Sequence, residues 1–318
     1  YTGDHRYVVT DSRYTEQVQR ECDGYKCMDI AGKGYVGCIN EILGDIACDK
    51  GSLRVGFENQ SISYREYQEY SAGLTHACLV DLDGSLDAMR QIKTDEEIEK
   101  LRTAESIGDA AFAHIVEYIR PGLTEKEIAL ELEYFMKKNG AEGLSFDTIA
   151  ASGLTSSMPH AIPTDKPLQD GDFLTMDFGC LYEGYCSDMT RTVAIGHVSD
   201  HMREVYETVL RAQTESMKSI RAGMPCNEVD GVARRIIADA GYGDCFGHGL
   251  GHSVGLFIHE NPRFSPKCTD ILKPGMVITV EPGIYIPGQF GVRIEDLVAV
   301  TEDGFVNLTK SDKQLIVI

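Results

Sequence analysis

The sequence predicts an α+β protein in which a small α/β domain, residues 1–88, precedes a larger domain of two related halves, residues 89–318. Three observations predict this organisation. Strand-like and helix-like segments alternate in the first domain. A turn signal separates them from a long amphipathic helix. Beyond that helix, two sequence windows recur after about 100 residues, which indicates that one structural unit has been duplicated.

The first domain is predicted from short apolar runs. Three of them read as strands, "YVVT" (Tyr7–Thr10), "LRVGFE" (Leu53–Glu58) and "HACLVDL" (His76–Leu82), because they are rich in residues that favour a pleated, half-buried surface. "DSRYTEQVQREC" (Asp11–Cys22) is predicted to turn into a helix. "DGS" (Asp83–Ser85) is a turn signal and marks the expected boundary.

A long helix is predicted to open the second domain. Thr94 and Glu97 have the spacing of a capping box. Apolar residues then recur at helical spacing: Ile98, Leu101, Ala104, Ile107, Ala111, Ile115 and Ile119. The helix is expected to end before "RPG" (Arg120–Gly122). His114 lies on it without an adjacent partner motif, and we interpret it as an ordinary helix histidine.

The second domain contains an internal repeat. "RPGLTEKEI" (Arg120–Ile128) resembles "RAGMPCNEV" (Arg221–Val229), at an offset of 221 − 120 = 101. "LQDGDFLTMD" (Leu168–Asp177) resembles "LKPGMVITVE" (Leu272–Glu281), at an offset of 281 − 177 = 104. Two windows at nearly the same offset favour duplication of a helix-plus-hairpin unit over chance matches.

The repeat brings acidic residues together. Glu281 and Glu295 flank a segment rich in glycine and proline, which predicts a hairpin that places both carboxylates near one point. Asp177 is the counterpart of Glu281, and the chain after it runs to a second acid, Asp188. Four carboxylates in one buried place repel each other and are unstable without cations. Two divalent cations would balance their four negative charges.

Histidines near these acids offer a nitrogen ligand. The segment "GHGLGHSVGLFIHE" contains His248, His252 and His259. The first two have the spacing of a zinc-protease helix, but the intervening glycines disfavour a helix and no glutamate follows the first histidine. One histidine as a ligand and another as a neighbouring or catalytic group fits better. His160 precedes His259 by 259 − 160 = 99 residues, so these two are candidate counterparts in the two halves.

The composition limits the partners and the compartment. The chain has 318 residues and a net charge of −20, which argues against nucleic acid and anionic membrane as partners, and no apolar run approaches the length of a membrane span. The ten cysteines form no C-x-x-C pair, which predicts free thiols in a reducing compartment, the cytoplasm. For Cys180 and Cys186 we favour buried packing over a metal-ligand role.

Taken together, "MDFG", "SDMTRT", "GHGLGHSVG", "TVEPGIYI" and "GVRIED" give the sequence a specific resemblance to a known family. Residues 94–318 resemble the metallopeptidases of the methionine aminopeptidase and creatinase superfamily, which have the pita-bread fold. The likeness is greatest to their proline-specific members, Xaa-Pro aminopeptidase and Xaa-Pro dipeptidase (prolidase). "VVTDSRYTEQ" (Val8–Gln17) resembles the latter part of the creatinase-type N-terminal domain, which is therefore expected to be partial.

The resemblance implies a dinuclear metal site. Its ligands would be Asp177, Asp188, His252, Glu281 and Glu295. Asp188 and Glu295 would bridge two divalent ions, Asp177 would complete one of them, and His252 with Glu281 the other. Such oxygen and imidazole ligands suit manganese, which we expect, with cobalt or zinc as alternatives. The ions would activate a bound water.

The resemblance also implies roles for residues around the metals. Glu281 would move the proton of the attacking water, and His259 and His160 would stabilise the tetrahedral intermediate by hydrogen bonds. Three further residues match positions that recur beside the metals: His248, Tyr285 and Arg293. Arg293 has the same strand parity as Glu295, so it could orient a carboxylate.

We therefore expect an Xaa-Pro aminopeptidase that acts on peptides with proline at the second position. No second basic residue besides Arg293 stands out as an anchor for a terminal carboxylate, which disfavours the alternative, an Xaa-Pro dipeptidase. A non-catalytic peptide-binding module of the same fold is less favoured, because such modules are expected to lose ligands and this chain retains all five ligand types. We expect a homodimer that binds neither nucleic acid nor membrane.

Overall fold

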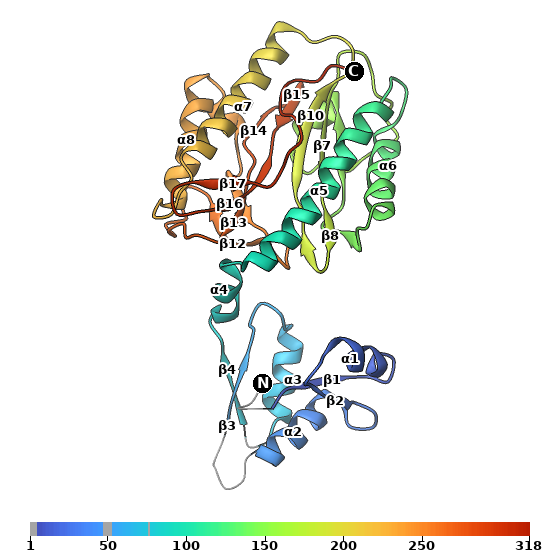
Figure 1. Ribbon diagram of the computed structural model, residues 1–318, viewed down its shortest axis with the longest axis vertical. Coiled ribbons are helices and arrows are strands. Elements are labelled where there is room, and N and C mark those ends of the chain that lie inside the picture. Colours follow the sequence, from blue (N-terminus) through green and yellow to red (C-terminus); the bar gives the residue numbers. More distant parts are fainter. Residues whose placement is uncertain (1–4, 47–52, 76) are drawn as a thin grey trace. The chain divides into compact units, whose positions relative to one another are not determined.

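A computed structural model describes residues 5–46, 53–75 and 77–318 (Figure 1). The chain divides into two compact units, Tyr1–Leu86 and Asp87–Ile318. None of the helices in the described ranges has the length and apolar character needed to cross a membrane.

The smaller unit is built from two parallel strand pairs. Its elements are β1 (Tyr7–Thr10), α1 (Thr15–Glu21), β2 (Lys26–Asp29), α2 (Gly34–Ile46), β3 (Leu53–Phe57), α3 (Tyr64–Gly73) and β4 (Ala77–Asp81). β1 pairs with β2, and β3 pairs with β4, each in parallel. A helix connects the strands of each pair, as parallel pairing requires. The predicted strands and first helix are present, although His76, where the third predicted strand begins, lies outside the described residues.

The larger unit consists of two halves that follow the short helix α4 (Ser85–Gln91). The first half contains α5 (Asp95–Tyr118), α6 (Glu125–Lys138), β5 (Gly143–Leu144), β6 (Ile149–Ser152), η1 (Gly153–Ser157), β7 (Phe173–Phe178), β8 (Cys180–Tyr182), β9 (Tyr185–Cys186) and β10 (Met189–Ala194). The second half contains α7 (Asp200–Lys218), α8 (Cys226–Asp239), η2 (Gly243–Cys245), β11 (Gly251–Ser253), β12 (Glu260–Phe264), β13 (Val277–Val280), β14 (Gly283–Ile286), β15 (Phe290–Arg293), β16 (Asp296–Val300) and β17 (Phe305–Asn307).

Helix α5 begins and ends as the sequence predicts. The Thr94 hydroxyl accepts a hydrogen bond from the Glu97 N–H at 3.3 Å, and the Glu97 carboxylate accepts one from the Thr94 N–H at 2.7 Å. The apolar residues of its periodic stripe pack in the core, and Glu105 is buried among them. His114, expected to be an ordinary helix histidine, contacts Glu131 of α6 at 2.6 Å.

The internal repeat is visible in the backbone. Helices α6 and α8 start and end at the same offset, 226 − 125 = 101 and 239 − 138 = 101. The glycines that precede them, Gly122 and Gly223, both have positive φ, 93° and 85°, a conformation that glycine adopts without strain. Their N–H groups donate to the carbonyls of Leu168 and Leu272, which are themselves 104 residues apart. The duplication of a helix-plus-hairpin unit is confirmed.

The sheets place the acidic residues. In the first half β7 lies between β6 and β10, and in the second half β13 lies between β11 and β16, all antiparallel. Asp177 lies on β7 and Asp188 directly precedes β10. Glu281 directly follows β13 and Glu295 directly precedes β16. The hairpins β8–β9 and β14–β15 join these strands, so each half presents two acids at the mouth of a hairpin.

Candidate metal centre

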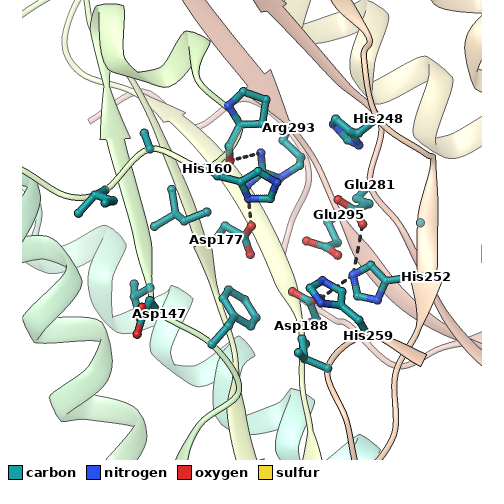
Figure 2. Close-up of a pocket in the computed structure, with 18 of the residues that line it drawn as sticks. Asp147, His160, Asp177, Asp188, His248, His252, His259, Glu281, Arg293 and Glu295 are labelled. Atoms are coloured by element: carbon teal, nitrogen blue, oxygen red, sulfur yellow. Dashed lines mark hydrogen bonds and ion pairs between the residues drawn. The ribbon is translucent and has the colours of Figure 1, made fainter. Parts of the chain in front are cut away.

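A cavity of about 830 Å³ in the larger unit gathers the predicted site residues from both halves (Figure 2). Its lining includes His160, Asp177, Asp188, His248, His252, His259, Glu281, Arg293 and Glu295. Tyr285 lies directly behind this lining, with its hydroxyl 3.0 Å from His248 Nε2. All ten residues singled out in the sequence therefore lie in or beside one cavity.

Carboxylates from both halves meet at its base. One oxygen each of Asp177, Asp188 and Glu295 lies within 4.8 Å of the others. His252 Nε2 lies 3.4 Å from Asp188 Oδ2 and 3.5 Å from Glu281 Oε1, so it joins the fourth carboxylate to the group. His252 lies on strand β11, not on a helix, which agrees with the argument against a zinc-protease helix.

Arg293 holds one carboxylate of the opposite half. Its guanidinium is buried at the end of β15 and donates to Asp177 Oδ2 at 2.6 Å and to the Tyr285 hydroxyl at 2.7 Å. Its Nε donates to Thr190 Oγ1 at 3.1 Å. A charge-assisted hydrogen bond from a guanidinium that is itself held by two other partners fixes the position of the Asp177 oxygen and compensates its charge. Arg293 thus links Asp177 of the first half to β15 of the second.

The surroundings of these carboxylates favour their protonated, neutral forms. Burial raises the pKa of Asp188 and of Glu295, and the neighbouring carboxylates raise both further. Burial also raises the pKa of Glu281 to about 8, although Arg293 opposes the shift. Burial lowers the pKa of His252 to about 3 and that of His248 to about 4, so both imidazoles are neutral near pH 7. A neutral imidazole can offer a nitrogen lone pair to a metal.

The donor set fits divalent cations. Asp177 Oδ1 and Glu295 Oε1 are buried and have no hydrogen-bond partner among the described residues. Buried oxygens without a donor are rare in proteins, and a cation would satisfy both. Carboxylate oxygens with one imidazole nitrogen form a ligand set suited to manganese, cobalt or zinc.

The two candidate catalytic histidines flank the carboxylates. The ring of His259 lies 4.5 Å from that of His252, between centroids, and burial lowers the pKa of His259. His160 is exposed in the segment between η1 and β7, and Figure 2 shows it near Asp177 and Arg293. Both histidines line the same cavity as the carboxylates.

Several residues at the site were not singled out from the sequence. Thr190 Oγ1 donates to Glu295 Oε2 at 2.6 Å, and Thr279 Oγ1 donates to Glu281 Oε1 at 3.2 Å. Thr190 lies in the motif "SDMTRT", and Thr279 is the threonine that both windows of the second repeat share. These two patterns could have identified the residues from the sequence.

Two charged residues were missed as well. Glu105 accepts hydrogen bonds from the Asp188 N–H at 3.3 Å and from Thr309 Oγ1 at 2.6 Å. In the sequence, Glu105 could have been noticed as an acid directly beside the apolar stripe of the predicted helix. Arg263 lines the cavity on β12, directly opposite His252 in the β11–β12 ladder. Its side chain has no hydrogen-bond or ion-pair partner within the described part of the chain.

Cys180 and Cys186 lie in apolar surroundings. Both are buried and belong to two of the hydrophobic cores. Burial raises the pKa of each thiol to about 11, so both are protonated near pH 7. They pack as small hydrophobic residues, as expected from the sequence.

Comparisons with known proteins agree with this geometry. Residues 99–302 match the family model of metallopeptidase family M24, and residues 1–92 match the creatinase/prolidase N-terminal domain. An "uncharacterized peptidase", YqhT of Bacillus subtilis strain 168, is 44% identical over 317 residues, which cover 100% of this chain and 88% of that protein.

Two solved structures are also similar. The Xaa-Pro dipeptidase from Bacillus anthracis has a TM-score of 0.92 and 44% identity, over 98% of this chain and 86% of that one. The X-Pro aminopeptidase from Thermotoga maritima MSB8 has a TM-score of 0.91 and 40% identity, over 99% of this chain and 88% of that one. The expected pita-bread domain with a creatinase-type N-terminal domain is confirmed, and the chain belongs to metallopeptidase family M24.

Proposed function

We propose that the protein is a dinuclear metal-dependent peptidase that hydrolyses the bond between an N-terminal residue and proline. The observation that carries the proposal is the convergence of four carboxylates and the neutral His252 from two halves on one cavity. The specificity for proline rests on the two similar structures, which are an Xaa-Pro dipeptidase and an X-Pro aminopeptidase.

The proposed ligands are Asp177, Asp188, His252, Glu281 and Glu295. Four ionised carboxylates balance two divalent cations, whereas one cation would leave buried negative charge uncompensated. Manganese is the proposed metal, with cobalt or zinc as alternatives. Bound in such a site, divalent cations lower the pKa of a coordinated water and polarise a carbonyl group.

The chain's own residues would move the protons and orient the substrate. Glu281 is the proposed base, because its carboxylate lines the cavity beside His252. It would take a proton from the attacking water and pass it to the leaving nitrogen of proline. His259 is neutral, and a ring N–H of His259 or His160 would donate to the oxygen that becomes negative during the attack. Arg293 would keep Asp177 in place, and Tyr285 would keep Arg293 in place.

The length of the substrate depends on Arg263. The expected aminopeptidase rested on the lack of a second basic residue to anchor a terminal carboxylate. Arg263 is such a residue: its exposed side chain lines the cavity, and it is the cross-strand neighbour of His252. This observation favours the Xaa-Pro dipeptidase as the second candidate, because a guanidinium can bind a carboxylate in a two-pronged manner.

A side-by-side assay tests both candidates. Ala-Pro and Ala-Pro-Ala-Ala are offered to the full chain with Mn²⁺, and the release of alanine is measured. Cleavage of both peptides supports the aminopeptidase, and cleavage of Ala-Pro alone supports the dipeptidase. In the second case Arg263→Met should raise the KM for Ala-Pro, whereas Lys267→Met, a nearby surface change, should not. Cleavage of neither peptide by the metal-loaded protein would contradict the proposal and favour a peptide-binding module.

The compartment and the oligomeric state of the protein are also proposals. The cysteines within the described ranges are free thiols, which supports a reducing compartment such as the cytoplasm. A homodimer is proposed, and the mass of the native particle in solution measures it.

A further inference from the structure

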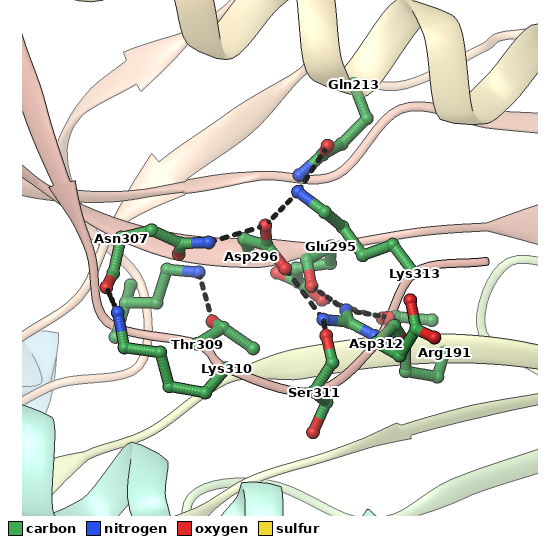
Figure 3. Close-up of polar contacts among 12 residues, drawn as sticks. Arg191, Gln213, Glu295, Asp296, Asn307, Thr309, Lys310, Ser311, Asp312 and Lys313 are labelled. Atoms are coloured by element: carbon green, nitrogen blue, oxygen red, sulfur yellow. Dashed lines mark hydrogen bonds and ion pairs between the residues drawn. The ribbon is translucent and has the colours of Figure 1, made fainter.

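Arg191 lies at the junction between the two halves of the larger unit (Figure 3). It lies on β10, three residues after Asp188, and its side chain is 1% exposed. Its Nη1 donates to the Thr190 carbonyl at 2.9 Å and also to the carbonyl of Glu295. Its Nη2 donates to Asp296 Oδ1 at 2.8 Å. Arg191 therefore binds the backbone of one proposed metal ligand and the side chain that follows it.

The same guanidinium binds the C-terminal segment of the chain. Nε donates to the Asp312 carbonyl at 3.0 Å, and Nη2 donates to the Ser311 carbonyl at 2.8 Å. With the three bonds above, these make five, which equals the number of N–H donors that a guanidinium has. A lysine has three donors on a single nitrogen and could not reach acceptors spread around a planar fork.

No sheet sets the distance between the two strands that Arg191 joins. β10 belongs to the three-stranded sheet of the first half and β16 to the five-stranded sheet of the second. A backbone hydrogen bond from the Glu295 N–H to the Thr190 carbonyl, 3.1 Å long, connects them. Arg191 donates to that same carbonyl. Its fork thus reinforces a junction that Thr190 Oγ1 also holds, by donating to Glu295 Oε2 and accepting from Arg293 Nε.

Lys313 is a natural comparison for Arg191. It binds the other oxygen of the same carboxylate, Asp296 Oδ2, at 2.6 Å, and also Gln213 Oε1 at 3.1 Å. No bond from Lys313 to the carbonyls of Thr190 or Glu295 is present in the described residues. Loss of either cation removes one positive partner from buried Asp296, but only loss of Arg191 also removes donors from the Thr190 and Glu295 carbonyls at the junction.

We infer that Arg191 is a positioning residue for the candidate metal centre, which holds β10 and β16 at the spacing that lets Asp188 and Glu295 bind the same cations. It also makes Ser311 and Asp312 of the C-terminal segment part of the support for that centre. The inference rests on the proposed function only in naming divalent cations as the ligand.

The test compares Arg191→Lys and Arg191→Met with Lys313→Met, each in the full chain. Mn²⁺ is titrated into the chelator-treated proteins by calorimetry, and thermal unfolding is followed in parallel. Supporting groups around metal ligands typically change metal affinity by about 10–100-fold. We expect a loss of that size in both Arg191 variants. Lys313→Met should bind Mn²⁺ like the parent even where its unfolding temperature is lower.

The outcomes separate the inference from general destabilisation. Parental Mn²⁺ affinity in Arg191→Lys would overturn it, as would an equal loss of affinity in Lys313→Met. Should Arg191→Met fail to fold, Arg191→Lys still decides, because it keeps the charge beside Asp296. Ala-Pro cleavage is measured separately with excess Mn²⁺, where the kcat of Arg191→Lys should recover towards that of the parent. A parent that binds Mn²⁺ but cleaves no peptide would refute the proposed function and leave the metal-affinity test intact.

Discussion

Asp188 and Glu295 are buried and Glu281 is half-buried where ionisation is opposed, so the charge of these three residues can be followed through stability. The folded protein raises the pKa of all three. Asp177 differs from them in having an arginine partner, Arg293, at 2.6 Å. One of the four carboxylates is therefore paired with an arginine, and the other three have no arginine or lysine partner among the residues that the structure describes. Added cations would mainly favour the ionised forms of these three.

In chelator, we expect the free energy of unfolding to fall as the pH rises from about 6.5 to about 8. The pKa of Glu281 is about 8 in the folded chain and 4.5 ordinarily, so the folded state keeps a proton that the unfolded state has lost. The stability linked to that proton is present below pH 4.5 and is lost as the pH rises through 8. A carboxylate that keeps its proton in the folded state contributes up to about 1.4 kcal/mol per pH unit. His252, with a pKa lowered from 6.5 to about 3, is neutral in the folded state there, and in the unfolded state it loses most of its proton between about pH 6.5 and about pH 7.5, which opposes the fall only at the lower end of the window.

Urea unfolding in chelator at the two ends of this window measures the slope. Glu281→Gln should make it shallower, and saturating Mn²⁺ should reduce it, because bound cations keep the ligand carboxylates ionised in the folded state. Burial also raises the pKa of Glu105 to about 8, and this residue is not a proposed ligand, so its share of the slope should remain. A metal-free protein that becomes more stable as the pH rises through this window would contradict the pKa shifts.

His259→Ala should lower kcat without releasing metal. A neutral imidazole that donates to the developing oxyanion contributes about 10²–10³ in rate. Since its proposed role is not that of a ligand, metal content measured by elemental analysis should match the parent. His252→Ala is the matched control and should lose both metal and activity. Loss of metal from His259→Ala would place this residue among the ligands and refute its assignment.

At the scale of elements, the hairpins between paired acids set the geometry of the site. Asp177 and Asp188 are joined through β8–β9, and the chain approaches itself closely at Gly179. A Cβ on Gly179 would lie 2.0 Å from the Ser187 carbonyl oxygen, which is backbone and directly precedes Asp188. The glycine is therefore required by close approach.

Gly179→Ala should displace Ser187 and with it Asp188. Overpacking of this kind costs about 1–3 kcal/mol, and Mn²⁺ affinity should fall because a proposed bridging ligand moves. Gly143→Ala is a control on the strand that pairs with β8, since a Cβ there meets only Leu181 Cδ1 at 3.5 Å, an ordinary contact. Urea unfolding and Mn²⁺ titration of both variants measure the difference. Equal effects would show that the close approach at Gly179 does not position the site.

The sequence predicts an element well where the residues that determine it lie within a few positions of one another in the chain. The capping box at Thr94 and the repeated glycines Gly122 and Gly223 act within a few residues of themselves, so periodicity and turn signals suffice to find them. Arg263 could not be found in this way, because its place depends on which strand lies opposite His252. Glu105 was visible as an acid beside an apolar stripe, but its contact with the Asp188 N–H depends on how α5 packs.

At the scale of the whole molecule, the duplication explains why the candidate site lies between halves. Each half supplies two acids at the mouth of a hairpin, and neither half alone supplies a complete ligand set. Arg293 of the second half holds Asp177 of the first, and Arg191 of the first binds the Glu295 carbonyl of the second. The two halves are therefore coupled through the site as well as through their cores.

The number of metal ions per chain tests the central claim most directly. Elemental analysis of the purified protein after saturation with Mn²⁺ and removal of free metal should give two ions per chain for the parent. Asp188→Ala should bind fewer and lose activity, because a bridging ligand serves both ions. An Asp188→Ala variant that binds as much metal as the parent would contradict the proposed convergence of the four carboxylates on one pair of cations.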